Sequence, residues 1–194
     1  MQGSDVSATE PDWSREKCTW GIWDPGPRLL RAIRRYQRWH GRRGLVAMFV
    51  RRVSIWDYRF WGIICGSSLS LEASLGGGLF LPHAHAIVIG PATLGPNCLV
   101  FQQVTIGTGP IPGWPRIGGH VDIGAGAKVL GGVVVGDHAK IGANAVVVQD
   151  VPPGATAVGV PARIVLAPTN EAVSNNGQCL SPSSTATASR SLRE

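Results

Sequence analysis

Two histidines stand in an otherwise apolar stretch, and their types and spacing are suited to chemistry. Residues 80–90 read FLPHAHAIVIG, with His83 and His85 two positions apart. An imidazole titrates near neutral pH, so such a ring can take up or release a proton during a reaction. On an extended segment, residues two apart share a face. The same H-x-H spacing also occurs in zinc sites, so metal binding has to be weighed beside acid–base chemistry.

The segments around these histidines carry a six-residue repeat. Aliphatic residues recur at steps of six, with one step of seven and one of eleven, and glycine follows many of them. This period fits a chain that makes a short strand, turns through about a third of a circle and repeats, so that three units close one triangular coil. We therefore predict a parallel β-helix of about four to five coils. Its inward positions are predicted to be Leu69, Leu75, Leu81, Ile87, Leu94, Val100, Ile106, Ile117, Ile123, Val129, Val135, Ile141 and Val147.

The segments on either side of the repeat differ from it in composition. Residues 1–66 form an arginine-rich N-terminal region, for which we predict one helix from Pro27 and a second over about residues 45–61. We expect residues 67–166 to form the β-helix domain. Residues 167–194 are rich in Ser, Thr, Ala and Asn and hold few large apolar residues, so this tail is predicted to be disordered.

The net charge is +6, and the positive charge is concentrated in one region. Ten of the 18 basic residues are arginines between Arg28 and Arg59. Such a run can form the solvated face of a helix, or it can bind an anionic partner such as a membrane surface or a nucleotide-linked or lipid-linked substrate. The region is therefore a candidate for peripheral membrane association, and we do not expect a nucleic acid partner.

The cysteines and the N-terminus indicate the compartment. Cys18, Cys65, Cys98 and Cys179 are far apart and include no CxxC pair. We interpret them as reduced thiols, not as a disulfide framework or a metal site. The sequence has no run of 18 apolar residues, and its N-terminus lacks the basic-then-apolar layout of a signal peptide. The expected location is the cytoplasm, either free or at a membrane surface.

Residues 68–165, about half of the chain, resemble serine O-acetyltransferases in several motifs at once. These motifs read LPHAHAIVIG, VTIGTG, IGAGAK and GVPARI, and the tandem [LIV]-G-x-x-x-x units are similar to those of hexapeptide-repeat proteins. The resemblance implies a left-handed β-helix, an acyltransferase that takes acetyl-CoA as its co-substrate, and a homotrimer with CoA grooves between subunits. IGAGAK and GVPARI recur in several related acetyltransferases, so singly they indicate only the wider class.

The resemblance also implies roles for individual residues. His83 matches the general base, which takes the proton of an attacking hydroxyl and later returns it to the departing thiolate. His85 either tunes His83 or only lines the groove. Lys140 and Arg163 are candidates for binding the CoA phosphates, which need cationic partners. The positions that would line the pantetheine arm are Gly107, Thr108, Gly109, Ala125, Gly126 and Ala143.

A catalytic metal is not expected. The γ-class carbonic anhydrases also use a left-handed β-helix, with three histidines around a metal. Their paired histidines, separated by four residues, have no match here, since His120 and His138 are eighteen residues apart. We therefore assign no metal ligand to His83 or His85.

The acceptor side departs from the pattern of the serine enzymes. Fifteen residues before the base, where those enzymes have an aspartate, this chain has Ser68, and Glu72 is the nearest acidic alternative. Pro82 replaces the aspartate that directly precedes the base, and Gly113–Trp114 replaces an Arg-His pair that helps to hold serine. These changes remove charged groups expected to bind an amino acid.

Three functions follow from these features. The acceptor-side residues favour O-acetylation of a sugar hydroxyl in an exopolysaccharide or its precursor, since Trp114 offers an aromatic surface and polysaccharide-associated O-acetyltransferases of the same superfamily are similar in LPH and QQVTIG. The alternative is a serine O-acetyltransferase of cysteine biosynthesis. A third hypothesis is a β-helix scaffold without catalysis, for which the missing aspartate argues and the intact His83 argues against.

Overall fold

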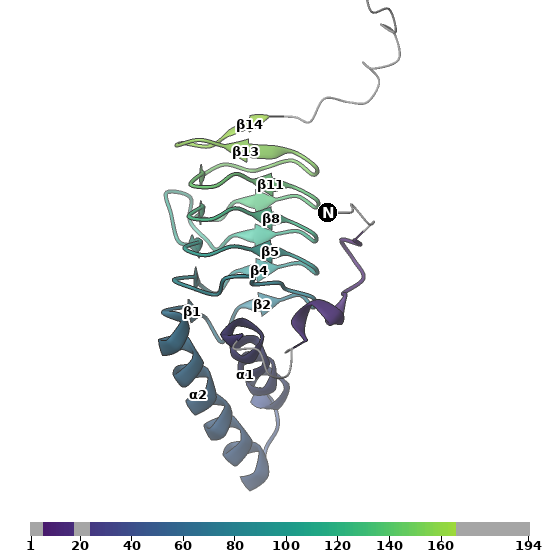
Figure 1. Cartoon of the computed structure of the whole chain (residues 1–194), viewed down its shortest axis with the longest axis vertical. Helices are drawn as coiled ribbons and strands as arrows, with labels where there is room; N and C mark the ends of the chain where they lie inside the picture. The colour runs from purple at the N-terminus through teal and green to yellow at the C-terminus, as the bar shows by residue number, and fades with distance from the viewer. Residues whose placement is uncertain (1–5, 18–23, 166–194) are drawn as a thin grey trace, which may run out of the picture.

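A triangular β-helix stands on a pair of helices (Figure 1). The structure is a computed structural model that describes residues 6–17 and 24–165, so the tail predicted at 167–194 lies outside the described residues. A short 3₁₀ helix, η1 (Trp13–Glu16), precedes α1 (Pro25–His40) and α2 (Leu45–Cys65). The helical pair is as predicted, although α1 begins two residues earlier than expected and α2 continues four residues further.

The ends of the two helices follow from local sequence. The carboxylate of Asp24 caps α1 by accepting a hydrogen bond from the Gly26 N–H (3.3 Å), and Pro25 occupies the first turn. Helix α2 ends at Gly66, whose φ of +57° is the left-handed conformation that glycine adopts without strain. The Arg35 side chain joins the helices by donating to Ser54 Oγ (2.8 Å) and to the Asp57 carboxylate (2.6 Å).

Three sheets form the sides of the prism, and each adds one short strand per coil. Sheet A holds β1 (Ser68–Leu69), β3 (Val88–Ile89), β6 (Thr105–Gly107), β9 (Lys128–Leu130) and β12 (Val146–Val147). Sheet B holds β2 (Ser74–Leu75), β4 (Thr93–Leu94), β7 (Arg116–Ile117) and β10 (Val134–Val135). Sheet C holds β5 (Leu99–Val100), β8 (Asp122–Ile123), β11 (Lys140–Ile141), β13 (Thr156–Val158) and β14 (Arg163–Val165). The paired strands are parallel apart from β13 and β14, which pair antiparallel at the top of the prism.

The inward side chains form vertical columns. In sheet C, Val100, Ile123, Ile141 and Ala157 lie at successive paired positions, and all four are buried. Burying an aliphatic side chain of this size contributes about 1.5–3 kcal/mol, so the columns supply much of the stability of the prism. The predicted left-handed β-helix is confirmed, with about five turns.

One predicted position in the repeat was wrong. Ile89, not Ile87, pairs with Leu69 on one side and with Ile106 on the other. Ile87 is also buried, but it fills the smaller inward position that precedes the column in each coil. The chain therefore takes eight residues from Leu81 to Ile89, where the neighbouring coil takes six from Val100 to Ile106. The two additional residues lie in the segment that contains the histidines.

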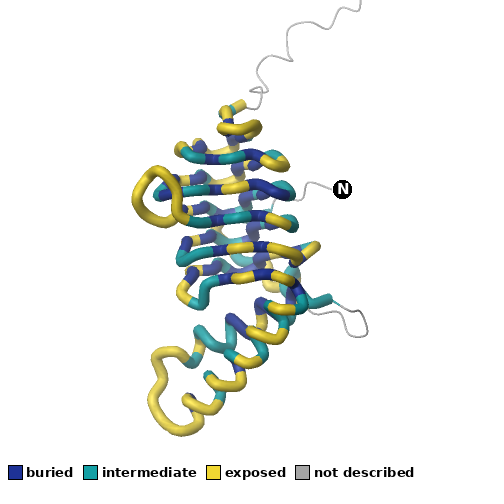
Figure 2. Tube along the Cα trace, turned by 90° about the vertical axis from the view of Figure 1, so that its left-hand side faces the viewer, coloured by how far each residue is buried: buried dark blue, intermediate teal, exposed yellow. Residues whose placement is uncertain are grey.

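The prism has three edges, named here by the sheets that they join. The C–A edge carries residues 82–87, 101–104, 124–127 and 142–145, and the A–B edge carries residues 107–115, which form the longest loop of the prism. The B–C edge is covered in part by residues 6–17, the N-terminal arm. The burial of the columns and the exposure of this long loop are visible in Figure 2.

Buried Asn97 fastens the N-terminal arm to the B–C edge. Its Oδ1 accepts a hydrogen bond from the Asp12 N–H, and its Nδ2 donates to the carbonyl oxygens of Ser7 and Glu10, each at 2.7 Å. These bonds join residues that are 85 to 90 positions apart in the sequence. The arm is thereby held against the coils of the prism.

Candidate active site at the C–A edge

His83 and His85 lie on an enlarged corner of the C–A edge. Both residues are exposed, whereas Ala84 between them is buried. Main-chain bonds hold the corner between its neighbours, since the Ala86 N–H donates to the Cys65 carbonyl (3.0 Å) and the His85 carbonyl accepts from the Gln103 N–H (2.9 Å). The two additional residues thus present the imidazoles outward from a fixed backbone.

Ser67 anchors this corner from inside, and sequence reasoning missed it. Its hydroxyl donates to the Ala84 carbonyl (2.8 Å) and accepts from the Ile87 N–H (3.0 Å), and the residue is buried. These bonds satisfy main-chain groups that the wider corner leaves without a partner in the coil. The available signal was a hydroxyl residue at an inward position, two residues before Leu69, where other coils carry an aliphatic residue or alanine.

The four candidates for the acceptor side are divided among sheet A and two of the edges. Ser68 is exposed on β1, where it pairs with Val88 of β3, and so lies on sheet A, whereas His85 lies on the C–A edge. Glu72 follows β1 and lies at the A–B edge, beside a cavity of about 420 Å³ that Tyr36, Gln37, His40 and Leu71 also line. In the described parts of the chain, no hydrogen bond or ion pair joins Ser68 or Glu72 to the His83 ring.

Trp114 also lies at the A–B edge, in the loop that follows β6. Its ring covers the backbone of Gly90 in the preceding coil so closely that a β-carbon at that position would collide with it. The indole nevertheless remains 41% exposed. It therefore presents one aromatic surface to solvent, on the other side of sheet A from His83.

The predicted CoA-binding residues form two groups. Gly107, Thr108 and Gly109 begin the loop at the A–B edge, where the Gly107 carbonyl accepts from the Gly131 N–H (2.8 Å). Ala125, Gly126 and Ala143 lie on the C–A edge above the histidines, in corners joined by the bond from the Asn144 N–H to the Ala125 carbonyl (2.8 Å). One chain therefore holds the two groups on opposite sides of sheet A.

Lys140 and Arg163 lie on the outer surface of sheet C. Lys140 is on β11 and pairs with Thr156 of β13, whereas Arg163 is on β14 and pairs with Val158 of the same strand. Both side chains are exposed. They stand next to the corners of Ala125 and Ala143, so two cations flank the upper C–A edge.

A second histidine pair occupies the B–C edge, far from His83 in the prism. His120 Nδ1 and His138 Nδ1 are 2.9 Å apart, which requires that one ring donates and the other accepts. Burial lowers the pKa of His120, while the nearby Asp122 opposes the shift and His138 adds to it. Among residues 6–17 and 24–165, no three metal-binding side chains converge.

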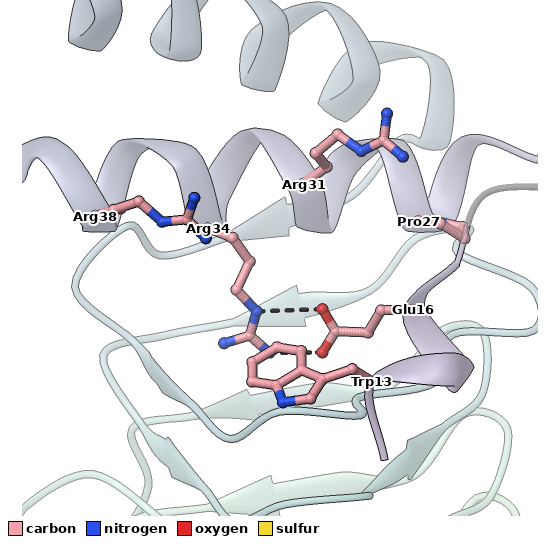
Figure 3. Close-up of a pocket in the computed structure, with 6 residues that line it drawn as sticks. All are labelled: Trp13, Glu16, Pro27, Arg31, Arg34 and Arg38. Atoms are coloured by element: carbon pink, nitrogen blue, oxygen red, sulfur yellow. Dashed lines mark hydrogen bonds and ion pairs between the residues drawn. The ribbon is translucent and has the colours of Figure 1, made fainter. Parts of the chain in front are cut away.

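Figure 3 shows a basic pocket between the N-terminal arm and α1. Its volume is about 330 Å³, and its lining is Trp13, Glu16, Pro27, Arg31, Arg34 and Arg38. The Glu16 carboxylate accepts two hydrogen bonds from the Arg34 guanidinium, at 2.7 and 3.2 Å, and Arg34 also donates to the carbonyl oxygens of Leu75 and Gly76. We interpret this pocket as the clasp between α1 and the prism, because its central charges are already paired.

The described cysteines are free thiols without a catalytic environment. Cys65 and Cys98 are both buried and form no disulfide. Burial raises the pKa of Cys98 to about 11 and also raises the pKa of Cys65. A thiol with so high a pKa is a poor nucleophile at neutral pH. Cys18 and Cys179 lie outside the described residues.

Comparisons with known proteins agree with the fold. The family model "Bacterial transferase hexapeptide (six repeats)" matches residues 115–149. A serine acetyltransferase of Helicobacter pylori strain J99 is 41% identical over 145 residues, which cover 73% of this chain and 81% of the relative. A serine acetyltransferase of Synechococcus elongatus is 37% identical over 138 residues, which cover 63% of this chain and 57% of the relative.

Solved structures of similar proteins cover the same region. A serine acetyltransferase in complex with CoA superposes with a TM-score of 0.62 at 32% identity, over 74% of this chain and 58% of that one. The Neisseria gonorrhoeae serine acetyltransferase in complex with serine gives a TM-score of 0.62 at 36% identity, over 74% and 58% of the two chains. This chain thus spans a little over half the length of those proteins.

Proposed function

Because the chain belongs to the serine acetyltransferase family of hexapeptide-repeat proteins, we propose that it transfers the acetyl group of acetyl-CoA to the hydroxyl of serine. The observation that carries this proposal is the exposed His83 on its enlarged, internally anchored corner, on the same C–A edge as Ala125 and Ala143. The relatives are named for serine as acceptor, and one solved neighbour contains serine. They support serine better than the sugar hydroxyl that the acceptor-side residues favoured.

His83 acts as general base in the proposed reaction. Its imidazole takes the proton of the acceptor hydroxyl as the oxygen attacks the thioester carbonyl, which forms the new C–O bond and a tetrahedral oxyanion. When the oxyanion collapses, the C–S bond breaks and the imidazolium returns its proton to the departing CoA thiolate. Ser67 positions the backbone that carries this ring, through its bonds to Ala84 and Ile87.

In the proposed assembly, two copies of the chain contribute to each CoA groove. Gly107, Thr108 and Gly109 lie at the A–B edge, whereas Ala125 and its neighbours lie at the C–A edge with His83. In a ring of subunits, the A–B edge of each subunit would contact the C–A edge of the next. This contact would bring the Gly107 group of one copy next to the Ala125 group of another. We infer a homotrimer, in which small residues line the pantetheine arm and Lys140 and Arg163 bind the CoA phosphates.

The proposal is tested by replacing the base and measuring thiol release from acetyl-CoA. With L-serine as acceptor, His83→Ala should lower kcat by about 10²–10⁴-fold, since a general base contributes that much. His85→Ala is the matched control on the same corner, and it should keep most of the activity. Light scattering on each variant confirms that the assembly is unchanged.

The acceptor is identified in the same assay with a panel of nucleotide-sugars and oligosaccharides. Saturable activity on serine, lost in His83→Ala, supports the proposal. Activity on a saccharide but not on serine would contradict serine as the acceptor. It would favour a sugar-binding role for the exposed Trp114 ring. Absence of acetyl transfer to every acceptor, with CoA binding intact, would instead favour the scaffold hypothesis.

A further inference from the structure

One face of α2 is apolar and exposed over the whole length of the helix. Leu45, Phe49, Trp56, Phe60 and Ile63 follow one another at steps of four, seven, four and three, so they lie on one side of the helix. Their exposed fractions range from 56% to 81%. A contiguous apolar surface of this kind, with three aromatic rings, is typical of a surface that contacts a partner.

The opposite side of α2 already packs within the chain. Ala47, Ser54 and Cys65 are buried, and Ser54 and Asp57 accept hydrogen bonds from Arg35 of α1. The apolar face therefore points away from α1. In Figure 1 the helical pair projects from one end of the prism.

The charges beside the face are positive. Arg52 and Arg59 are exposed on the same side of α2, and Arg42, Arg43 and Arg51 surround a hollow of about 410 Å³ at the start of the helix. Asp57 is the one acidic residue of α2, and its carboxylate is bound by Arg35 (2.6 Å) and by the Trp61 indole N–H (2.9 Å). The exposed face thus offers apolar side chains and cationic groups without an acidic neighbour on its own helix.

We propose that α2 lies flat on an anionic lipid surface and holds the protein there. An interfacial helix of this type buries its apolar side in the boundary between headgroups and acyl chains, while its cationic groups contact anionic headgroups. Within residues 6–17 and 24–165, no helix is long and apolar enough to cross a membrane. Packing two copies of α2 face to face would bring their arginines together, so the charge favours lipid over a second copy. This inference goes beyond acetyl transfer and does not depend on it.

The proposal is tested by flotation of the full chain with vesicles of phosphatidylcholine alone or mixed with phosphatidylglycerol. We expect binding to the mixed vesicles, at least tenfold weaker binding to phosphatidylcholine alone, and weakening by added salt. Phe49→Ser/Trp56→Ser/Phe60→Ser should reduce binding to the mixed vesicles at least a hundredfold, because it removes three large side chains from the apolar face. Val134→Ser/Val160→Ser, which changes exposed apolar residues of the prism, is the control and should bind like the original chain.

A second pair of variants tests the charges independently. Arg52→Gln/Arg59→Gln should bind mixed vesicles about thirtyfold more weakly, at about 1 kcal/mol for each basic residue near the surface. Lys17→Gln/Arg116→Gln removes the same charge elsewhere and should have little effect. If circular dichroism shows that the triple variant has lost its helices, the comparison of these two charge variants tests the proposal in its place.

Two results would overturn the proposal. The first is either no binding of the original chain to anionic vesicles, or equal binding by the triple variant or by the Arg52→Gln/Arg59→Gln variant. The second is a decrease in the mass of the assembly in the triple variant, measured by light scattering, without vesicle binding by the original chain. That second result would assign the face to contact between copies.

Discussion

The prism and the helical pair use apolar residues in opposite ways. In the prism, the columns of sheets A, B and C turn their aliphatic side chains inward, and Ile106, Ile123 and Val129 have no exposed surface. In α2, Phe49 and Trp56 are each 69% exposed. The repeat closes on itself after three strands, so each inward residue meets others of its kind. An isolated pair of helices has no third element to cover the outer face of α2.

This difference separates two tasks. The prism supplies a rigid support whose edges carry the exposed chemistry, with His83 on one edge and the Gly107 loop on another. The helical pair closes one end of that support with buried residues of α1 and leaves the apolar face of α2 exposed. The two regions share one apolar core, to which α1 contributes Leu29, Leu30 and Ile33. Arg34 adds a polar connection, since it donates to the carbonyl oxygens of Leu75 and Gly76.

Truncating one apolar residue in each region should show the contrast most strongly. Ile123→Ala leaves a cavity in the sheet C column, and we expect a loss of about 3 kcal/mol in the free energy of unfolding. Phe49→Ala should change that free energy by no more than about 0.5 kcal/mol, because its ring is mostly in water already. Chemical denaturation without lipid measures both. Equal losses for the two variants would contradict the contrast.

A pair of glycines distinguishes the packed corners of the prism from the edge that we propose binds CoA. A β-carbon at Gly95 would meet the backbone of Gly118 in the next coil, so Gly95→Ala should cost about 3 kcal/mol of stability. No atom lies within 4 Å of the position that a β-carbon at Gly107 would take. Gly107→Ala should therefore melt like the original chain but raise the KM for acetyl-CoA. An unchanged KM would remove Gly107 from the proposed pantetheine groove.

Breaking the clasp should uncouple the two regions. Arg34→Ala leaves the Glu16 carboxylate, which is largely buried, without its ion-pair partner, and we expect about 2 kcal/mol of destabilisation. The helices should then melt before the prism, which circular dichroism can follow at helix and strand wavelengths. Arg31→Ala, at an exposed position of the same helix, is the control. A single cooperative transition at the original temperature would show that the clasp is dispensable.

The smallest expected effect is a pH dependence at the B–C edge. The pKa of His120 is lowered below 6.5 in the folded chain, so the unfolded chain binds a proton more readily. The contribution of the His120–His138 pair to the free energy of unfolding is therefore complete above pH 6.5. It is lost as the pH falls through the lower pKa of the folded chain. His120→Asn, which suits the positive φ of this position, should lower Tm by less than about 2 °C at pH 7.5, and the difference in Tm should shrink as the pH falls below 6.5. A difference that grows toward pH 5 would contradict the assignment.

Much of the fold could be predicted because the repeat is local. A step of six residues places each aliphatic residue above its counterpart in the preceding coil, so the spacing alone indicated the three sheets and most of the columns. The helical pair also followed from local signals, namely Pro27 and the apolar spacing of each helix, although α1 begins at Pro25 and α2 continues to Cys65. The exception was Ile87, because the two additional residues before Ile89 do not interrupt the apolar pattern.

The candidate site was only partly predictable. The motif identified His83, but the sequence did not indicate that Ser67 holds its corner from inside or that Glu72 lies on another edge. It also did not show that the Gly107 loop and the corner of Ala125 stand on opposite sides of sheet A. These relations depend on which coil and which edge a residue reaches, and the spacing of neighbouring residues does not encode that.

The sequence by itself determined the triangular coil, the inward columns, the two helices and the basic character of residues 28–59, since each of these depends on residues within a few positions of one another. Only the tertiary structure decided how the N-terminal arm binds Asn97 across 85 to 90 residues, how Arg34 joins α1 to the prism, and which face of α2 stays uncovered. Contacts between distant segments form only when the whole chain is folded, because the entropy lost in closing long loops is recovered only through many contacts made together.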